Sequence, residues 1–245
     1  MRLLTHFLFS LSLMIVAGQS FSAQWSVPTD FELKMLPPYC TAKVKNDTAL
    51  IQKYAPEVGP QFANIHHYCF ALNFLNRFYS DTNRSEAKSY LAFALDDFGY
   101  MTQHLIPGNT SLTAEIYLNQ GVAESLQGRD AEAVRDLQKA IELNPRLDRA
   151  YATQAKFFAD RRQQAEALKI VSQGLRYAPE SKRLKRLYLK FGGKLPYPEP
   201  IDQEEPKPTV QSQETSSTPE QPTPAAEEKQ KIGTPSNPWC RFCPE

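Results

Sequence analysis

Four cysteines are the residues of this 245-residue chain with the clearest chemistry. Cys40 and Cys69 have 28 residues between them, and an even number of cysteines in an oxidising compartment predicts disulfides. A bond between these two would tie the segment before the first clear helix to that helix and would contribute about 3 kcal/mol through chain entropy. A metal site that uses the adjacent His66 and His67 together with Cys69, and with Cys40 as a further ligand, is the alternative. Adjacent side chains on a helix diverge by about 100°, so we expect the disulfide, with no metal and no cofactor.

The second pair, Cys240 and Cys243, forms a Cys-x-x-Cys motif. Such a motif is a redox dithiol, half of a metal site, or a haem attachment when a histidine follows. Pro244 follows here, and no second pair of this spacing completes a zinc site, so we expect a small local disulfide. Thiol exchange with an oxidoreductase of the cell envelope is the alternative. Trp239 and Phe242 return apolar surface to a polar stretch, which predicts a short recognition element.

The remaining polar residues form no recognisable catalytic constellation. The chain has no serine-centred elbow, no glycine-rich phosphate loop and no His-Glu-x-x-His motif. Asp96 and Asp97 are adjacent on an expected helix, so they diverge, do not match the paired acids of a glycosidase and are predicted to face solvent. We therefore expect the protein not to be an enzyme.

An internal repeat predicts the elements that position these residues. Pro145 and Pro179 lie 34 residues apart. The same offset relates Tyr117 to Tyr151, Gly121 to Ala155, Ala133 to Ala167, Leu137 to Val171, and Ala140 to Gly174. A fixed period of this length predicts helix pairs stacked into a solenoid. Small residues such as Gly121 and Ala133 are expected where two antiparallel helices approach closely, and Pro145 is expected to stop the second helix.

Residues 114–147, with the sequence AEIYLNQGVAESLQGRDAEAVRDLQKAIELNPRL, resemble a tetratricopeptide repeat, and residues 148–181 are similar to a second one. The resemblance implies an all-α fold, a short right-handed solenoid of helix pairs. Around the two repeats we expect an irregular segment over 24–61, a degenerate helix pair over 62–113 and a capping helix over 182–196.

Proteins that carry this repeat generally bind extended peptides or partner helices along the concave face, which the first helix of each pair lines. By position, the groove candidates are Glu115, Leu118, Val122 and Ser125, followed by Arg149, Ala152, Lys156 and Ala159. Leu118 and Val122 stand where chaperone-binding members carry carboxylate-clamp residues, so we do not expect that clamp. The resemblance implies a scaffold or adaptor that binds a protein or peptide of mixed apolar and charged character.

The N-terminal 23 residues are typical of a secretory signal peptide, with Arg2, an apolar run from about Leu8 to Ala17 and small residues at the end. We expect cleavage after Ser22 or Ala23. An uncleaved anchor is the alternative, but the run is shorter than the ~20 residues of a spanning helix. The sequence therefore predicts a periplasmic or secreted protein that serves an envelope complex or polymer.

Charge divides the rest of the chain. Residues 24–196 carry 23 basic and 18 acidic residues, whereas residues 197–245 carry 4 basic and 9 acidic residues together with 10 of the 19 prolines. That composition predicts a disordered tail over 197–245. Basic residues gather before it at Arg176, Lys182, Arg183, Lys185, Arg186, Lys190 and Lys194. We expect a solvated cap face, with an anionic surface or the acidic tail as the alternative ligand and no nucleic acid.

Overall fold

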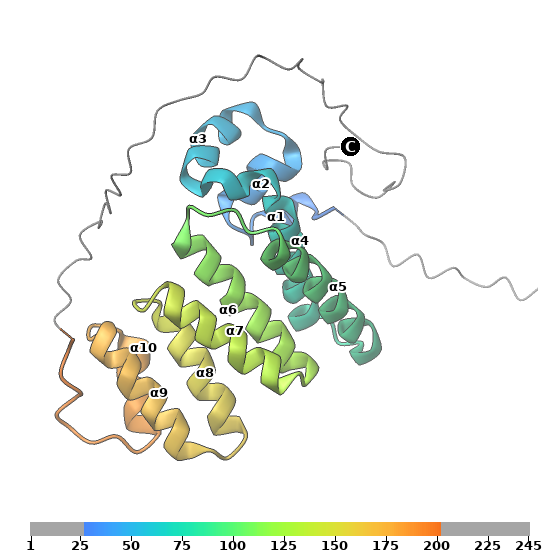
Figure 1. Ribbon diagram of the computed structural model, residues 1–245. Helices are drawn as coiled ribbons and strands as arrows, with labels where there is room; N and C mark the ends of the chain where they lie inside the picture. The colour runs from blue at the N-terminus through green and yellow to red at the C-terminus, as the bar shows by residue number, and fades with distance from the viewer. Residues whose placement is uncertain (1–26, 202–245) are drawn as a thin grey trace, which may run out of the picture.

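The computed structural model describes residues 27–201, and this part of the chain is entirely helical (Figure 1). No strand occurs between residues 27 and 201. The helices are α1 (Asp30–Leu33), α2 (Pro38–Lys45), α3 (Thr48–Val58), the 3-10 helix η1 (Gly59–Ala63), α4 (Ile65–Ser80), α5 (Arg84–Gln103), α6 (Thr110–Gln127), α7 (Asp130–Leu143), α8 (Asp148–Asp160), α9 (Gln164–Tyr177) and α10 (Lys182–Lys190). None of them combines the length and apolarity needed to cross a membrane.

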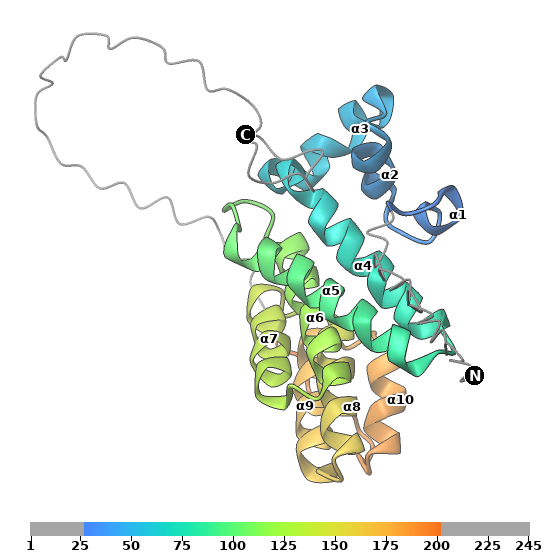
Figure 2. The same ribbon diagram turned by 90° about the vertical axis from the view of Figure 1, so that its right-hand side faces the viewer.

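Helices α4 to α9 form three pairs, α4 with α5, α6 with α7 and α8 with α9, and α10 packs against the last pair (Figures 1 and 2). The first helices also contact each other in order, α4 with α6, α6 with α8 and α8 with α10. Asp148 begins α8 and Lys182 begins α10, again 34 residues apart, so α10 occupies the place of a further first helix. The predicted all-α helical-repeat architecture is confirmed.

Two clusters of buried apolar residues hold the helices together, and they meet at α6. The first cluster joins α1 to α6 and contains Phe98 and Ile116, and the second joins α6 to α10 and contains Leu118 and Tyr151. Small residues allow the close approach that the repeat predicts. A Cβ atom on Gly121 would lie only 2.9 Å from Cγ of Leu137 on α7.

The segment 24–61 is not irregular, contrary to our expectation, because its described part folds into α1, α2, α3 and the start of η1. Pro38 is the first residue of α2, a position where the missing amide hydrogen costs nothing. Asn46 then turns the chain with a left-handed φ of 52°, and the Asp47 carboxylate caps α3 by accepting from the Leu50 amide at 3.0 Å. These short helices bury Leu33, Cys40 and Val44, among others, in the first cluster.

Residues 1–26 and 202–245 lie outside the described part of the chain. The predicted signal peptide, the tail beyond residue 201, the Cys240–Cys243 motif and the recognition residues Trp239 and Phe242 all fall there and stay predictions.

Candidate functional site

A cavity of about 480 Å³ opens where the N-terminal helices meet the first helices of the repeat pairs. Its floor consists of Tyr68 and Leu72 on α4, Leu112, Glu115 and Asn119 on α6, and Arg149 on α8. Its walls are Pro37 and Tyr39 at the start of α2, Glu57 and Val58 at the end of α3, and Asn109 and Ser111 at the start of α6. A cavity of this size is within the range of ligand-binding pockets.

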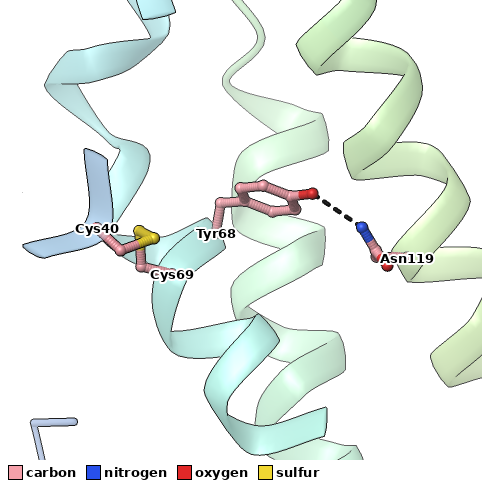
Figure 3. The surroundings of a disulfide bond; sticks show 4 residues. All are labelled: Cys40, Tyr68, Cys69 and Asn119. Atoms are coloured by element: carbon pink, nitrogen blue, oxygen red, sulfur yellow. Dashed lines mark hydrogen bonds between the residues drawn. A yellow bond between two sulfur atoms is a disulfide. The ribbon is translucent and has the colours of Figure 1, made fainter. Parts of the chain in front are cut away.

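Hydrogen bonds fix the floor of the cavity. The side-chain amide of Asn119 donates to the Tyr68 hydroxyl at 2.8 Å and so joins α6 to α4 (Figure 3). The same amide donates to the Glu115 carbonyl oxygen at 2.8 Å, which holds its orientation. The Asn109 side chain donates to the Glu57 carbonyl oxygen at 3.0 Å and joins the start of α6 to the end of α3. The floor and one wall are therefore set before any ligand binds.

Ion pairs join successive first helices. The Arg149 guanidinium on α8 donates to the Glu115 carboxylate on α6 at 2.9 Å, at the edge of the cavity. One repeat later, Arg183 on α10 lies 3.4 Å from Asp148 on α8. The hydroxyl of Ser181, which caps α10, also donates to Asp148 at 2.5 Å. The first helices therefore carry polar links as well as an apolar core.

The cavity keeps its phenols neutral. Burial, together with the negative charges of Glu115 and Glu57, raises the pKa of Tyr39 well above its usual range. Burial also raises the pKa of Tyr68, and the Tyr39 and Glu115 groups act in the same direction. Both hydroxyls therefore remain protonated at physiological pH and can donate a hydrogen bond.

Cys40 on α2 and Cys69 on α4 are joined in the disulfide that their spacing predicts. Both residues are fully buried. Figure 3 shows that Cys69 points toward α2 while the neighbouring Tyr68 points toward α6. The disulfide therefore fastens a wall of the cavity to the helix that forms part of its floor.

The predicted groove residues divide into accessible and inaccessible ones. Leu118 and Ala152 are only 1% and 3% exposed and belong to the second core cluster, so the expectation that they line an open groove is wrong. Both side chains fill the space between packed helices, which leaves no surface for a ligand. The accessible candidates are Glu115 and Arg149 at the cavity, the half-buried Val122, Ser125 and Ala159, and the exposed Lys156.

Several cavity residues were not among the predicted ones. Tyr39, Glu57 and Val58 come from the segment that we expected to be irregular. No residue pattern in that segment predicted that it would form a wall of a cavity. Tyr68 and Asn119 lie on helices whose positions were predicted, but their hydrogen bond joins residues 51 positions apart and has no local signal.

A histidine and an aspartate form a second polar cluster on α4 and α5. Asp97 is only 8% exposed and lies 2.7 Å from Nδ1 of His67, so the expectation that it faces solvent is wrong. Burial raises the pKa of Asp97. Burial, the His67 ring and Lys43 lower the pKa of His66 to about 3, which keeps that imidazole neutral. No group of three or more potential metal ligands occurs among residues 27–201.

Comparison with known proteins identifies the central repeat. Residues 114–147 match the tetratricopeptide repeat family model. A stretch of 71 residues is 35% identical to the human tetratricopeptide repeat protein 6, and it covers 29% of this chain and 14% of that protein. The matched repeat is α6 paired with α7.

Proposed function

We propose that this tetratricopeptide-repeat protein is a scaffold that binds an extended segment of a partner protein along its first helices and seats an apolar side chain of that segment in the cavity. Repeats of this family serve protein–protein interaction, generally without catalysis, and the cavity is the observation that supports a defined binding place. It lies where α4, α6 and α8 come together, so a bound segment would contact three successive first helices.

The cavity combines apolar and charged groups in a way that suits a peptide. Leu72, Val58 and Leu112 supply apolar surface, while Glu115 and Arg149 place a carboxylate and a guanidinium at the same site. An apolar anchor residue would remove the apolar surface from water, and the neighbouring backbone and charges of the peptide would pair with the polar groups.

We further propose that the protein works outside the cytoplasm, as an adaptor in the cell envelope. The signal-like residues 1–23 support export, and the buried Cys40–Cys69 disulfide suits an oxidising compartment. Fractionation of cells, with mass spectrometry of the mature N-terminus, tests this: a cytoplasmic chain that retains Met1 would contradict it. Thiol exchange through Cys240 and Cys243 stays an alternative prediction.

Peptide selection on the full chain tests the binding function. Ser111 is exposed at the cavity, and Ser111→Phe would occupy part of the cavity and leave the buried core residues unchanged. Ser89→Phe makes the same change on the exposed face of α5 and is the matched control. We expect selected peptides to share an apolar or aromatic anchor and to lose at least about tenfold in affinity, or ~1.4 kcal/mol, with Ser111→Phe only. Peptides that bind both variants equally would contradict the proposal.

A further inference from the structure

We infer that the cavity has a ligand within the same chain: the C-terminal segment, with Trp239 and Phe242 in the cavity and the acidic residues between 202 and 228 over basic residues of α8 and α10. The segment would compete with the partner peptide. Because both use one cavity, this assignment depends on the proposed function.

Basic residues continue from the cavity along the first helices. Arg183, Arg186 and Lys190 on α10 stand 34 positions after Arg149, Ala152 and Lys156 on α8. We name the basic strip as Lys156, Arg183, Arg186 and Lys190. Arg183 is paired with Asp148, whereas Lys156, Arg186 and Lys190 are exposed, with no acidic side chain of residues 27–201 within 4.0 Å. Three of the four residues of the strip therefore carry positive charge with no acidic partner among residues 27–201, and they lie on helices α8 and α10, the first of which contributes Arg149 to the cavity.

The C-terminal segment has the complementary chemistry in the matching order. Residues 202–228 contain seven acidic residues and one lysine. Trp239 and Phe242, which follow them, are the only aromatic residues after residue 201. A segment that starts beside α10 would therefore meet the basic strip with its acidic part first and reach the cavity with its aromatic part.

The length of the segment suits the distance. Ile201 donates its amide hydrogen to the Arg176 carbonyl oxygen near the end of α9, which fixes the starting point. Residues 202–238 form a connection of 37 residues, and a flexible chain of that length has a root-mean-square reach of about 35 Å. Packed helices lie about 8 to 10 Å apart, so α10 and the cavity floor at α4 and α6 are on the order of 20 to 30 Å apart.

Tethering makes even a weak contact effective. A connection of this kind gives an effective concentration on the order of 1 mM, so a segment with an intrinsic Kd of about 100 μM would occupy about nine-tenths of the cavities. An external peptide would then bind about tenfold more weakly than it binds the free cavity. A partner would thus need a higher intrinsic affinity for the cavity in order to displace the C-terminal segment.

Trp239 itself reports on docking. The chain has two tryptophans, Trp25 and Trp239, so Trp25→Phe leaves Trp239 as the single emitter in the full chain. We expect blue-shifted emission that acrylamide quenches poorly, independent of protein concentration. Adding Ser111→Phe should shift the emission to the red and restore quenching, whereas adding Ser89→Phe should not.

The charge contribution has its own matched variants. Lys156→Glu with Arg186→Glu reverses two exposed residues of the basic strip, and Lys88→Glu reverses an exposed lysine on α5. We expect the double variant to expose Trp239, the Lys88→Glu control to leave it buried, and added salt to weaken docking in the parent chain.

Three results would overturn the inference: solvent-exposed Trp239 emission in the Trp25→Phe chain, burial of Trp239 that Ser111→Phe does not change, or burial of Trp239 that is lost on dilution, which would mean docking between copies.

Peptide binding separates a failure of this inference from a failure of the proposed function. If Trp239 is exposed and Ser111→Phe still lowers the affinity for the selected peptides, the inference about the C-terminal segment is wrong and the proposed function stands. If Trp239 docks but no library peptide binds the Trp239→Ala, Phe242→Ala chain, the proposed partner function falls. If both hold, that double variant should bind the selected peptides about tenfold more tightly.

Discussion

At the scale of single residues, the absence of one methyl group decides how closely α9 approaches its neighbours. Gly174 on α9 lies against Tyr151 of α8 and Leu184 of α10. A Cβ atom there would lie 2.7 Å from Cγ and 2.8 Å from Cβ of Tyr151, and 2.9 Å from a Leu184 methyl carbon. The Cβ atom of Tyr151 cannot move without its helix. The glycine therefore permits the packing of three helices.

Gly174→Ala is expected to lower the free energy of unfolding by about 1 to 3 kcal/mol, because the added methyl overpacks the core. Gly99→Ala is the matched control, since the nearest atom to its new Cβ is 3.9 Å away at the end of the Gln103 side chain. Gly99 lies within α5, so alanine there should stabilise by about 0.5 to 1 kcal/mol. Urea unfolding of both variants measures whether the free energy of unfolding falls in Gly174→Ala and rises in Gly99→Ala. Destabilisation of equal size in the two variants would contradict the packing argument.

Two buried acidic residues lie on the neighbouring helices α6 and α7. Glu124 and Asp136 are 1% and 2% exposed, and the Arg135 guanidinium lies 2.8 Å from Asp136 and 3.9 Å from Glu124. Burial and the nearby Asp136 raise the pKa of Glu124 to about 7. The folded protein therefore holds a proton on Glu124 at pH values where the unfolded chain has lost it.

The contribution of Glu124 to stability should therefore fall as pH rises from about 4.5 to about 7, because in that window its carboxyl group is protonated to a greater extent in the folded state than in the unfolded state. Glu124→Gln removes this dependence, so its stability relative to the parent chain should rise with pH and level off above pH 7, by about 3 kcal/mol in total. Glu142→Gln, on an exposed glutamate of α7, is the control. Urea unfolding between pH 5 and 8 measures the difference, and parallel curves for parent and Glu124→Gln would refute the assignment.

At the scale of elements, α1 to α3 form a unit that the disulfide fastens to α4. Tyr39 and Val58 of this unit provide a wall of the cavity, while Cys40 provides the covalent bond to Cys69. The integrity of the cavity thus depends on a connection between elements outside the matched tetratricopeptide repeat.

Replacing Cys40 and Cys69 by serine should lower the free energy of unfolding by about 3 kcal/mol, because the unfolded chain loses a closed loop. The variant should also release the wall, so peptides selected on the parent chain should bind more weakly and proteases should cut within 27–63 first. The Cys240→Ser, Cys243→Ser chain is the control and should keep both stability and protease resistance. Equal effects of the two double variants would contradict the assignment of the wall to Cys40 and Cys69.

The elements differ in how far the sequence predicts them. Pro145 and Ala133 recur with a 34-residue offset, and Gly121 is matched by the small residue Ala155, which was enough to place α6 to α9. The N-terminal helices have no such period. They are short, one begins at a proline, and their burial depends on contact with distant parts of the chain.

The candidate site was predictable only in part, because it also depends on contacts between parts of the chain that are distant in sequence. Repeat register gave Glu115 and Arg149 as groove candidates at equivalent positions of the first helices, and the structure shows the two side chains paired at the cavity. Register alone could not tell that Leu118 turns into the core, since that depends on how closely α6 and α8 pack. The cavity also needs a wall from α2 and α3, and only the folded chain brings Tyr39 to Glu115.

At the scale of the whole molecule, helices mostly contact their neighbours along the chain. Contacts run from each pair to the next, and the two core clusters share only α6. In such a solenoid, stability is approximately a sum of local terms and nearest-neighbour interfaces, so damage at one end is transmitted only through successive interfaces. The cavity lies close to α6, where the two clusters meet.

Hydrogen exchange should reveal this arrangement. Leu184→Ala in α10 and Leu91→Ala in α5 each remove a buried leucine, 0% and 2% exposed, and each should cost about 2 to 5 kcal/mol. We expect Leu184→Ala to speed amide exchange in α8 to α10 and to leave α4 and α5 nearly unchanged, while Leu91→Ala does the reverse. Helix α6 should respond to both, because it contributes residues to both clusters. Uniform acceleration in every helix, by either variant, would instead show a single cooperative unit, in which a ligand at the cavity would stabilise α10 as strongly as α4.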